Sequence, residues 1–225
     1  LCKEAADAMA PYHQAGIDGL VAGNGNANSL YEVGRTAFRA LEQAREDIAR
    51  SIKARPDEMT FTSGATEADN AALFGIVDAA MARAEQEGDH ECVPQIVVSS
   101  IEHDAVLKAA ETLGHWGAQV TYVEPDSSGH ITPDALEEVL TDRVLLVSIM
   151  AVNTQAFGKI PVSVKEWGVD ALSISSHKIG GPKGMGALYV KARTPFTAQI
   201  VGGGQESGRR SGTQNVMAAV GFSAA

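Results

Sequence analysis

Lys178 lies in a short stretch whose residue types could do imine chemistry, Ser173-Ile-Ser-Ser-His-Lys-Ile-Gly-Gly-Pro-Lys-Gly184. An apolar run before it predicts a buried strand, and Gly180, Gly181 and Gly184 after it predict a tight loop. A lysine held at the end of a buried strand can present a neutral amine, which forms an imine with a carbonyl compound or an aldehyde cofactor. An ordinary lysine whose ammonium reaches solvent at the strand end is a slightly better explanation of this stretch taken alone.

A second stretch, Phe61-Thr-Ser-Gly-Ala-Thr-Glu-Ala-Asp-Asn70, has the pattern of a strand, a glycine turn and a helix start. The N–H groups of Ala65 and Thr66, with the Thr66 hydroxyl and the helix dipole, would form a cradle for phosphate. The spacing matches neither a Walker loop nor the dinucleotide fingerprint, which disfavours a nucleoside triphosphate or dinucleotide site. An ordinary helix cap by Ser63 or Thr66 accounts for the same residues.

His103 stands where a predicted strand gives way to a helix. A histidine there could stack on an aromatic ring or carry a proton, and it could also simply cap the helix. A glycine-rich stretch at 202–215 contains two adjacent arginines and Thr213, which suits an anion, a subunit contact or a flexible loop. A phosphate cradle, a ring-stacking histidine and an imine-forming lysine together fit one cofactor, pyridoxal 5'-phosphate.

The elements that must position these residues alternate between short apolar strands and helices, which predicts an α/β fold with three layers, a mostly parallel sheet sandwiched by helices. We expect strands at 59–62, 95–99, 120–123, 144–151, 169–174 and 187–190. We expect helices at 3–9, 66–86, 104–113 and 133–140. A further amphipathic helix, with apolar residues facing a core, would be capped by Ser29 and Glu32 and stopped by Pro56.

Composition sets limits on the class of protein. The chain has 225 residues, 44% hydrophobic content and a net charge of -10, which predicts a globular protein without nucleic acid or membrane as its main partner. Cys2 and Cys92 are far apart and the histidines are scattered, so we expect neither a disulfide framework nor a metal site. With no signal peptide or transmembrane stretch, we expect a cytoplasmic protein.

Five stretches resemble those of NifS-like cysteine desulfurases, in the class V aminotransferase group of fold-type I pyridoxal-phosphate enzymes. They are TSGATEADN, SSIEHDAV, VSIMAVN, DALSISSHKIGGPKGMGALYV and VGGGQESGRRSGTQN, in the family's order along nearly the whole chain. The last two are the most specific, and the GGGQExGxRSGT pattern points to the NifS and IscS branch. The resemblance implies residues 1–28 as a lead-in segment and 29–225 as the large cofactor-binding domain.

The resemblance also implies roles for individual residues. Lys178 would be the Schiff-base lysine and the proton carrier at the substrate carbon, and His103 would stack on the pyridine ring. Asn153 would lie near the ring and Gln155 would meet its hydroxyl. The residues implied in phosphate binding are Ala65, Thr66, Ser175, His177 and, toward the phosphate of the partner subunit of a homodimer, Thr213. The family reaction takes L-cysteine to L-alanine and leaves a persulfide on a mobile cysteine, for delivery to a sulfur acceptor such as an iron–sulfur scaffold.

The chain departs from the family pattern in three places. The family's first segment is absent ahead of Leu1, and the persulfide-cysteine loop and small domain are absent beyond Ala225. About two dozen residues of the pattern, with the aspartate that pairs with the pyridine nitrogen, are absent between Asn153 and Thr154. A parallel crossover there would also need more chain than is present. We therefore expect N-terminal, internal and C-terminal segments to be missing from these 225 residues, which would be incomplete for activity.

Three alternatives stay open at this point. A related class V lyase or aminotransferase would use the same cofactor for a different reaction. A non-catalytic scaffold remnant of the same fold would use none of this chemistry. The third concerns the chain itself, which represents either segments of a longer enzyme or a truncated form. Neither Cys2 nor Cys92 stands where the resemblance places the nucleophilic cysteine, so no catalytic cysteine is assigned.

Overall fold

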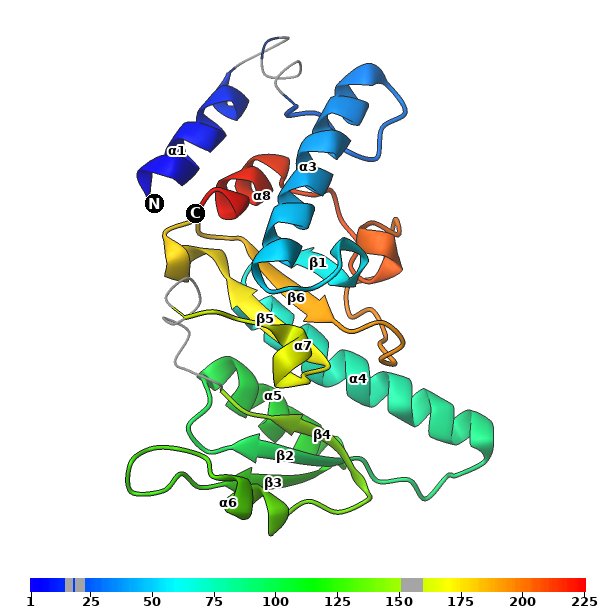
Figure 1. The fold of residues 1–225 in the computed structure, drawn as a ribbon. Coiled ribbons are helices and arrows are strands. Elements are labelled where there is room, and N and C mark those ends of the chain that lie inside the picture. The colour runs from blue at the N-terminus through cyan, green and yellow to red at the C-terminus, as the bar shows by residue number, and fades with distance from the viewer. Residues whose placement is uncertain (15–17, 19–22, 151–159) are drawn as a thin grey trace. The chain divides into compact units, whose positions relative to one another are not determined.

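A computed structural model describes residues 1–14, 18, 23–150 and 160–225 (Figure 1). The chain divides into two compact units. The first comprises Leu1–Ala68, Thr154–Arg193 and Ile200–Ala225, and the second comprises Asp69–Asn153 and Thr194–Gln199. Each unit has its own sheet and its own hydrophobic core, so each is described by itself.

The sheet of the first unit has the strand order β1-β6-β5, with β1 at Met59–Thr62, β5 at Ala171–Ser175 and β6 at Gly186–Val190. The central strand, β6, runs antiparallel to both neighbours. The antiparallel pairing of β5 and β6 follows from the short connection between them, because a parallel return would need a crossover of a dozen or more residues. Consequently β1 and β5 run parallel to each other on either side of β6.

Helices complete the first unit. The chain starts with α1 (Lys3–Met9) and the 3-10 turn η1 (Ala10–His13), and α8 (Val216–Ser223) lies beside both α1 and α3 (Glu32–Ser51) (Figure 1). Other short elements are η2 (Pro56–Glu58), α7 (Val164–Trp167), η3 (Ser176–Ile179) and η4 (Glu206–Gly208). The core contains residues of α3, β1, β5, β6 and α8.

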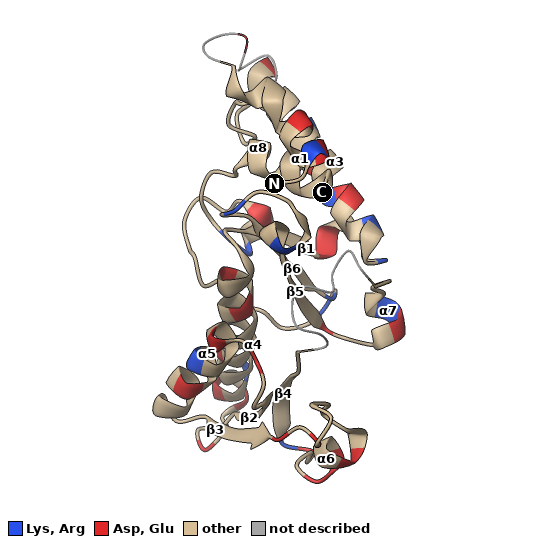
Figure 2. Cartoon of the chain, turned by 90° about the vertical axis from the view of Figure 1, so that its left-hand side faces the viewer, with Lys and Arg blue, Asp and Glu red and all other residues tan. Residues whose placement is uncertain are grey.

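Helix α3 confirms the expected amphipathic pattern, because Ala37, Leu41, Ala44 and Ile48 are all buried. Acidic and basic residues are interspersed along the helix (Figure 2), and the exposed ones are Glu32, Arg35, Arg39, Glu46 and Arg50. The predicted cap by Ser29 and Glu32 is wrong. The helix begins at Glu32 with Tyr31 as its N-cap, and the Ser29 hydroxyl accepts a hydrogen bond from the Tyr31 N–H instead. Ser29 lies too far before the first helical residue to reach the N–H groups of the first turn.

The second unit contains an all-parallel sheet of order β3-β2-β4. Its strands are β2 (Gln95–Ser99), β3 (Gln119–Val123) and β4 (Val144–Ser148), and its helices include α5 (Asp104–His115) and α6 (Pro133–Glu137). Helix α4 (Ala65–Glu87) begins in the first unit and continues into the second. Buried side chains of α4, β2 and α5 form the core. The α/β class is confirmed, and parallel pairing within the described residues is confined to this sheet.

Candidate active site

The register of the first sheet brings two predicted site segments to one edge. Gly186 of β6 pairs with Thr62, the last residue of β1, and with Ser175, the last residue of β5. Since β1 and β5 run in the same direction, the chain leaves both strands at this same edge. The chain after β1 passes through the turn at Gly64 to Ala65 and Thr66 at the start of α4, and the chain after β5 forms η3, which contains His177 and Lys178. The predicted phosphate cradle and the predicted imine lysine therefore belong to neighbouring loops of one sheet.

Lys178 lies in η3, whose backbone is fixed on both sides. The Ser176 N–H donates to the Met185 carbonyl at 3.2 Å, and the Ser176 carbonyl accepts from the Gly181 N–H at 3.0 Å. Gly180, with φ of 92°, ends the turn in the left-handed region, and its carbonyl accepts a hydrogen bond from the Cys2 N–H at 2.6 Å. Backbone hydrogen bonds therefore hold the turn that carries Lys178 on both sides.

The Lys178 side chain is partly buried, and it forms no ion pair with any residue in the described part of the chain. An amine without a carboxylate partner is not committed to a structural salt bridge. Imine formation requires an amine that can reach the carbonyl carbon, and the turn fixes the backbone from which the Lys178 amine extends. The neighbouring Ser175 is buried and His177 is exposed.

The cradle loop is built around Gly64, which has φ of 151° and open space where a Cβ would stand. The Thr62 hydroxyl donates to the Gly64 carbonyl at 2.9 Å and so closes the turn. Helix α4 starts directly after it, at Ala65. The first N–H groups of a helix have no carbonyl one turn earlier to accept them, and the helix dipole favours an anion there. The open space and the helix start fit a phosphate group.

A glycine-rich loop, residues 201–215, contacts the start of α4 through an ion pair. The Arg210 Nε lies 2.9 Å from Oε1 of Glu67, and the two side chains are 24% and 16% exposed. Thr213 follows in the same loop and is exposed. Its predicted role toward a partner subunit stays a prediction.

Glu206, whose side chain is 1% exposed, anchors the same loop. Its carboxylate accepts hydrogen bonds from Arg45 at 2.6 and 3.0 Å and from the Phe61 N–H at 2.7 Å. Sequence reasoning missed Arg45, Glu67 and Glu206. One signal was available, because Arg45 stands beside Ala44 and Ile48 on the apolar face of α3, and a buried charge requires a partner.

His103 lies in the second unit, where it is the N-cap of α5. Its Nδ1 accepts a hydrogen bond from the Ala105 N–H at 3.0 Å, and the side chain is exposed. The capping interpretation is thus correct, and a capped ring has a fixed orientation. Because Lys178 belongs to the first unit, ring stacking by His103 stays a prediction. Asn153 and Gln155 lie outside the described residues.

Burial, together with the nearby charge of Asp69, raises the pKa of Glu102 to about 7, although a hydrogen bond from Ser99 opposes the shift. The carboxyl group of Glu102, the residue directly before His103 in the sequence, therefore changes its protonation state near neutral pH. Among the described residues no group of three or more histidine, cysteine, aspartate or glutamate side chains could hold a metal ion. Cys2 and Cys92 are both free thiols.

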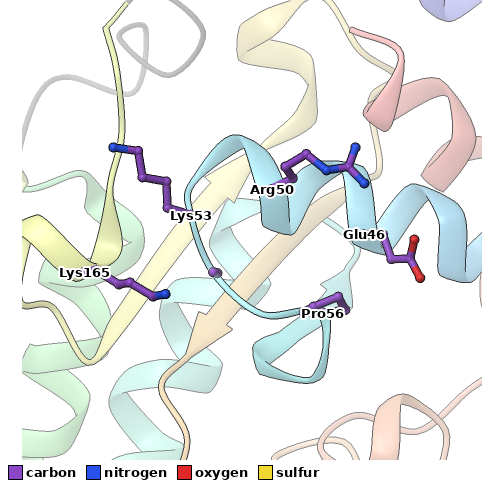
Figure 3. Close-up of a pocket in the computed structure, with 6 residues that line it drawn as sticks. Glu46, Arg50, Lys53, Pro56 and Lys165 are labelled. Carbon is purple, nitrogen blue, oxygen red and sulfur yellow. The ribbon is translucent and has the colours of Figure 1, made fainter.

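A pocket of about 480 Å³ lies away from these loops, at the C-terminal end of α3 (Figure 3). It is lined by Glu46, Arg50, Lys53, Ala54, Pro56 and Lys165. Arg50 and Lys53 already pair with Asp47 and Glu166. None of the predicted site residues that the structure describes lines it. None of the described helices is long and apolar enough to cross a membrane.

Comparisons with known proteins agree on one family. The family described as Aminotransferase class-V matches residues 3–155 and 153–225. The chain is 37% identical to cysteine desulfurase IscS of Dictyoglomus turgidum over 249 residues, which cover 99% of this chain and 59% of that protein. It is also 37% identical to an IscS-like cysteine desulfurase of Mycobacterium tuberculosis, covering 97% of this chain and 62% of that one.

Solved structures are similar in the same way. A structure described as SspA in complex with cysteine has a TM-score of 0.87 at 31% identity, covering 99% of this chain and 68% of that one. A NifS-like protein has a TM-score of 0.85 at 32% identity, covering 99% of this chain and 65% of that one. The chain spans about three fifths of the length of the curated relatives it matches. By its sequence and its fold, the chain belongs to the class-V aminotransferase family.

Proposed function

We propose that the whole protein is a pyridoxal-phosphate-dependent cysteine desulfurase. It would convert L-cysteine to L-alanine and transfer the sulfur atom to a cysteine thiol of the enzyme as a persulfide. The observation that carries this proposal is the pairing of Thr62 and Ser175 with Gly186, because it brings the cradle loop and the Lys178 loop to one edge of one sheet. The relatives named cysteine desulfurase support the choice of reaction.

Different residues of this chain would bind different parts of the cofactor. Ala65 and Thr66 at the start of α4 would hold the phosphate together with Ser175 and His177, where the helix dipole offsets its charge. Lys178 would bind the aldehyde carbon of the cofactor covalently. His103 would stack on the ring, Asn153 and Gln155 would contact it, and Thr213 would reach the phosphate of a partner subunit.

When bound, pyridoxal phosphate supplies an electron sink for the bonds at the substrate carbon. The chain's own contribution is position and proton transfer. Lys178, on a turn fixed by Ser176 and Gly181, would deliver and remove the proton at that carbon. The neighbouring structure described as SspA in complex with cysteine supports L-cysteine as the substrate proposed here.

The partners and location belong to the same proposal. The protein would act as a homodimer in the cytoplasm and would pass its sulfur to an acceptor protein for iron–sulfur clusters and other thio-cofactors. The proposed role in supplying sulfur for iron–sulfur clusters is supported by relatives that bear the name IscS.

An internal gap near 153–154 is part of the proposal as well. Two observations support it: the family matches in two pieces that meet at residues 153–155, and the alignment with the Dictyoglomus protein extends over 249 residues although this chain has 225. The activity is therefore to be measured on the full-length protein.

The test is turnover of L-cysteine by the full-length protein with pyridoxal phosphate and a thiol reductant. We expect alanine and sulfide in equal amounts, loss of both with Lys178→Ala, and retention of both with Lys183→Ala, which removes an exposed lysine from the same loop. Turnover of a different amino acid without sulfide would instead favour a related class V lyase or aminotransferase. No turnover of any amino acid by cofactor-loaded protein would favour a scaffold.

A further inference from the structure

The Glu67 carboxylate stands between two loops of the first unit. On one side Arg210 of the glycine-rich loop donates to it, with Nε to Oε1 at 2.9 Å and Nη2 to Oε2 at 3.4 Å. On the other side Ser63 donates to Oε2 twice, from its N–H at 2.9 Å and from its hydroxyl at 2.6 Å. Ser63 immediately precedes Gly64, Ala65 and Thr66. One carboxylate therefore links the phosphate cradle to residues 201–215.

Arg210 also lies close to the backbone of the residues that follow it. A Cβ on Gly212, which has φ of 111°, would lie 3.1 Å from Nη1 of Arg210. The Gly212 N–H donates to the Gln205 side chain at 2.9 Å. Thr213 comes next and is exposed. The guanidinium thus lies against the segment that presents Thr213.

The electrostatics favour a charged pair. Burial alone would raise the pKa of the Glu67 carboxyl, but the hydrogen bonds from Arg210 and Ser63 outweigh burial and hold that pKa below its ordinary value. Hydrogen bonds to a charged group are stronger than those between neutral groups, and a forked guanidinium fixes direction as well as distance. A lysine at position 210 would keep the charge and lose the fork.

We propose that Glu67 and Arg210 are positioning residues that couple the phosphate cradle to the segment presenting Thr213. Loss of the Glu67 carboxylate would release Ser63 and the cradle, and loss of Arg210 would release residues 211–214 and leave the carboxylate that holds Ser63 without its guanidinium partner. This proposal rests on the proposed function only where it concerns pyridoxal phosphate, since the coupling between the two loops is a property of the chain without the cofactor.

The test uses the full-length protein and the variants Glu67→Gln, Arg210→Gln and the double variant. The visible absorbance of bound cofactor gives the Kd for pyridoxal phosphate. We expect each single change to weaken binding about tenfold, and the double variant to be no weaker than the single ones, because the two side chains act as one unit. Arg210→Lys should fall between wild type and Arg210→Gln.

Arg209→Gln is the matched control. It removes the same charge from the same loop, but within the described part of the chain the Arg209 side chain donates only to the Asp57 carbonyl, at 3.2 Å. We expect its Kd for pyridoxal phosphate to stay within about twofold of wild type. An equal loss of binding in Arg209→Gln and Arg210→Gln would mean that loop charge, and not position, controls binding, and would overturn the proposal.

Amide hydrogen exchange of the cofactor-free protein supplies a second measurement that does not depend on the proposed function. Glu67→Gln should speed exchange at residues 211–214, far along the chain from the substitution, and Arg209→Gln should not. Unchanged exchange in this segment, or additive effects of the two single changes on Kd, would contradict the coupling. If wild-type protein bound no pyridoxal phosphate, the proposed function would fail, whereas the exchange measurement would still decide the coupling.

Discussion

Gly186 lies directly against Gly64, and a Cβ on Gly186 would stand 2.7 Å from the Gly64 carbonyl carbon and 2.8 Å from its Cα. The central strand of the first sheet therefore touches the cradle loop, with no room for a side chain between them. Both contacts are with backbone atoms, which cannot rotate away as a side chain can. The position of the cradle depends on a glycine in β6.

Replacing Gly186 by alanine should push the cradle loop away from the sheet. Overpacking of this kind lowers the free energy of unfolding by about 1–3 kcal/mol, and we expect the Kd for pyridoxal phosphate to rise as well. Thermal unfolding and cofactor titration measure the two effects. Gly114→Ala is the control, because its Cβ would meet only Val120, at 3.6 Å. Equal behaviour of the two variants would show that the contact with Gly64 is unimportant.

The turn that carries Lys178 has a similar close contact between Gly181 and Ser176. A Cβ on Gly181 would collide with the Ser176 hydroxyl, which is buried and has no hydrogen-bond partner among the described residues. Gly181→Ala should displace the turn and reduce covalent loading of Lys178 with cofactor. Ser176→Ala alone should change the free energy of unfolding by less than about 1 kcal/mol, because no hydrogen bond is lost.

The double variant Ser176→Ala/Gly181→Ala separates crowding from other effects. Removal of the hydroxyl frees the space that the new methyl group needs, so loading should recover in part. Recovery should be incomplete, since the Ser176 carbonyl would still lie 3.0 Å from the Cβ. Loading no better than in Gly181→Ala would mean that the hydroxyl is not what the methyl group meets.

The buried pair of Arg45 and Glu206 should matter greatly for stability. Removing one partner of a buried ion pair leaves an uncompensated charge and costs about 3–5 kcal/mol, so Glu206→Gln should lower the melting temperature by roughly 6–20 °C at about 2–4 °C per kcal/mol. Glu42→Gln is the control, because Glu42 is 35% exposed and also pairs with Arg45. A small shift for Glu206→Gln, matching that of Glu42→Gln, would contradict this reading.

Glu102 should make stability depend on pH near neutrality. Its pKa in the folded protein is raised from the ordinary 4.5 to about 7, with burial as the largest cause. Between these values the folded state binds more protons than the unfolded state, so the free energy of unfolding falls as pH rises from about 4.5 to 7. Glu102→Gln mimics the protonated form and should remove this loss.

Melting temperatures at pH 5 and pH 8 test the Glu102 prediction. The margin by which Glu102→Gln exceeds wild type in stability should be larger at pH 8 than at pH 5. A constant difference between the two proteins across this range would show that Glu102 does not titrate there.

Local patterns were enough to predict several elements from the sequence. Helix Lys3–Met9 and strand Gln95–Ser99 were predicted with their exact bounds, and the buried face of α3 was predicted from its apolar spacing. These elements depend on neighbouring residues and on a periodicity that a short window contains. The segments around Lys178 and the cradle were recognised for the same reason, as strand ends followed by glycines.

What the sequence could not supply depends on distant partners. Glu206 lies 161 residues from Arg45, and Arg210 lies 143 residues from Glu67, so no local pattern joins them. The antiparallel position of β6 between β1 and β5 also depends on tertiary pairing, which the spacing of apolar residues in the sequence does not reveal. The cap predicted at Ser29 failed because the helix begins at Glu32, and element boundaries are set by packing as much as by local residue type.

The proposed pyridoxal-phosphate chemistry depends most directly on Lys178. The decisive measurement is peptide mapping by mass spectrometry after borohydride reduction of the full-length protein loaded with pyridoxal phosphate. We expect one modified peptide, with the cofactor's mass on Lys178, and none in Lys178→Ala. Modification at another lysine, or an equal amount of adduct in Lys178→Ala, would contradict it.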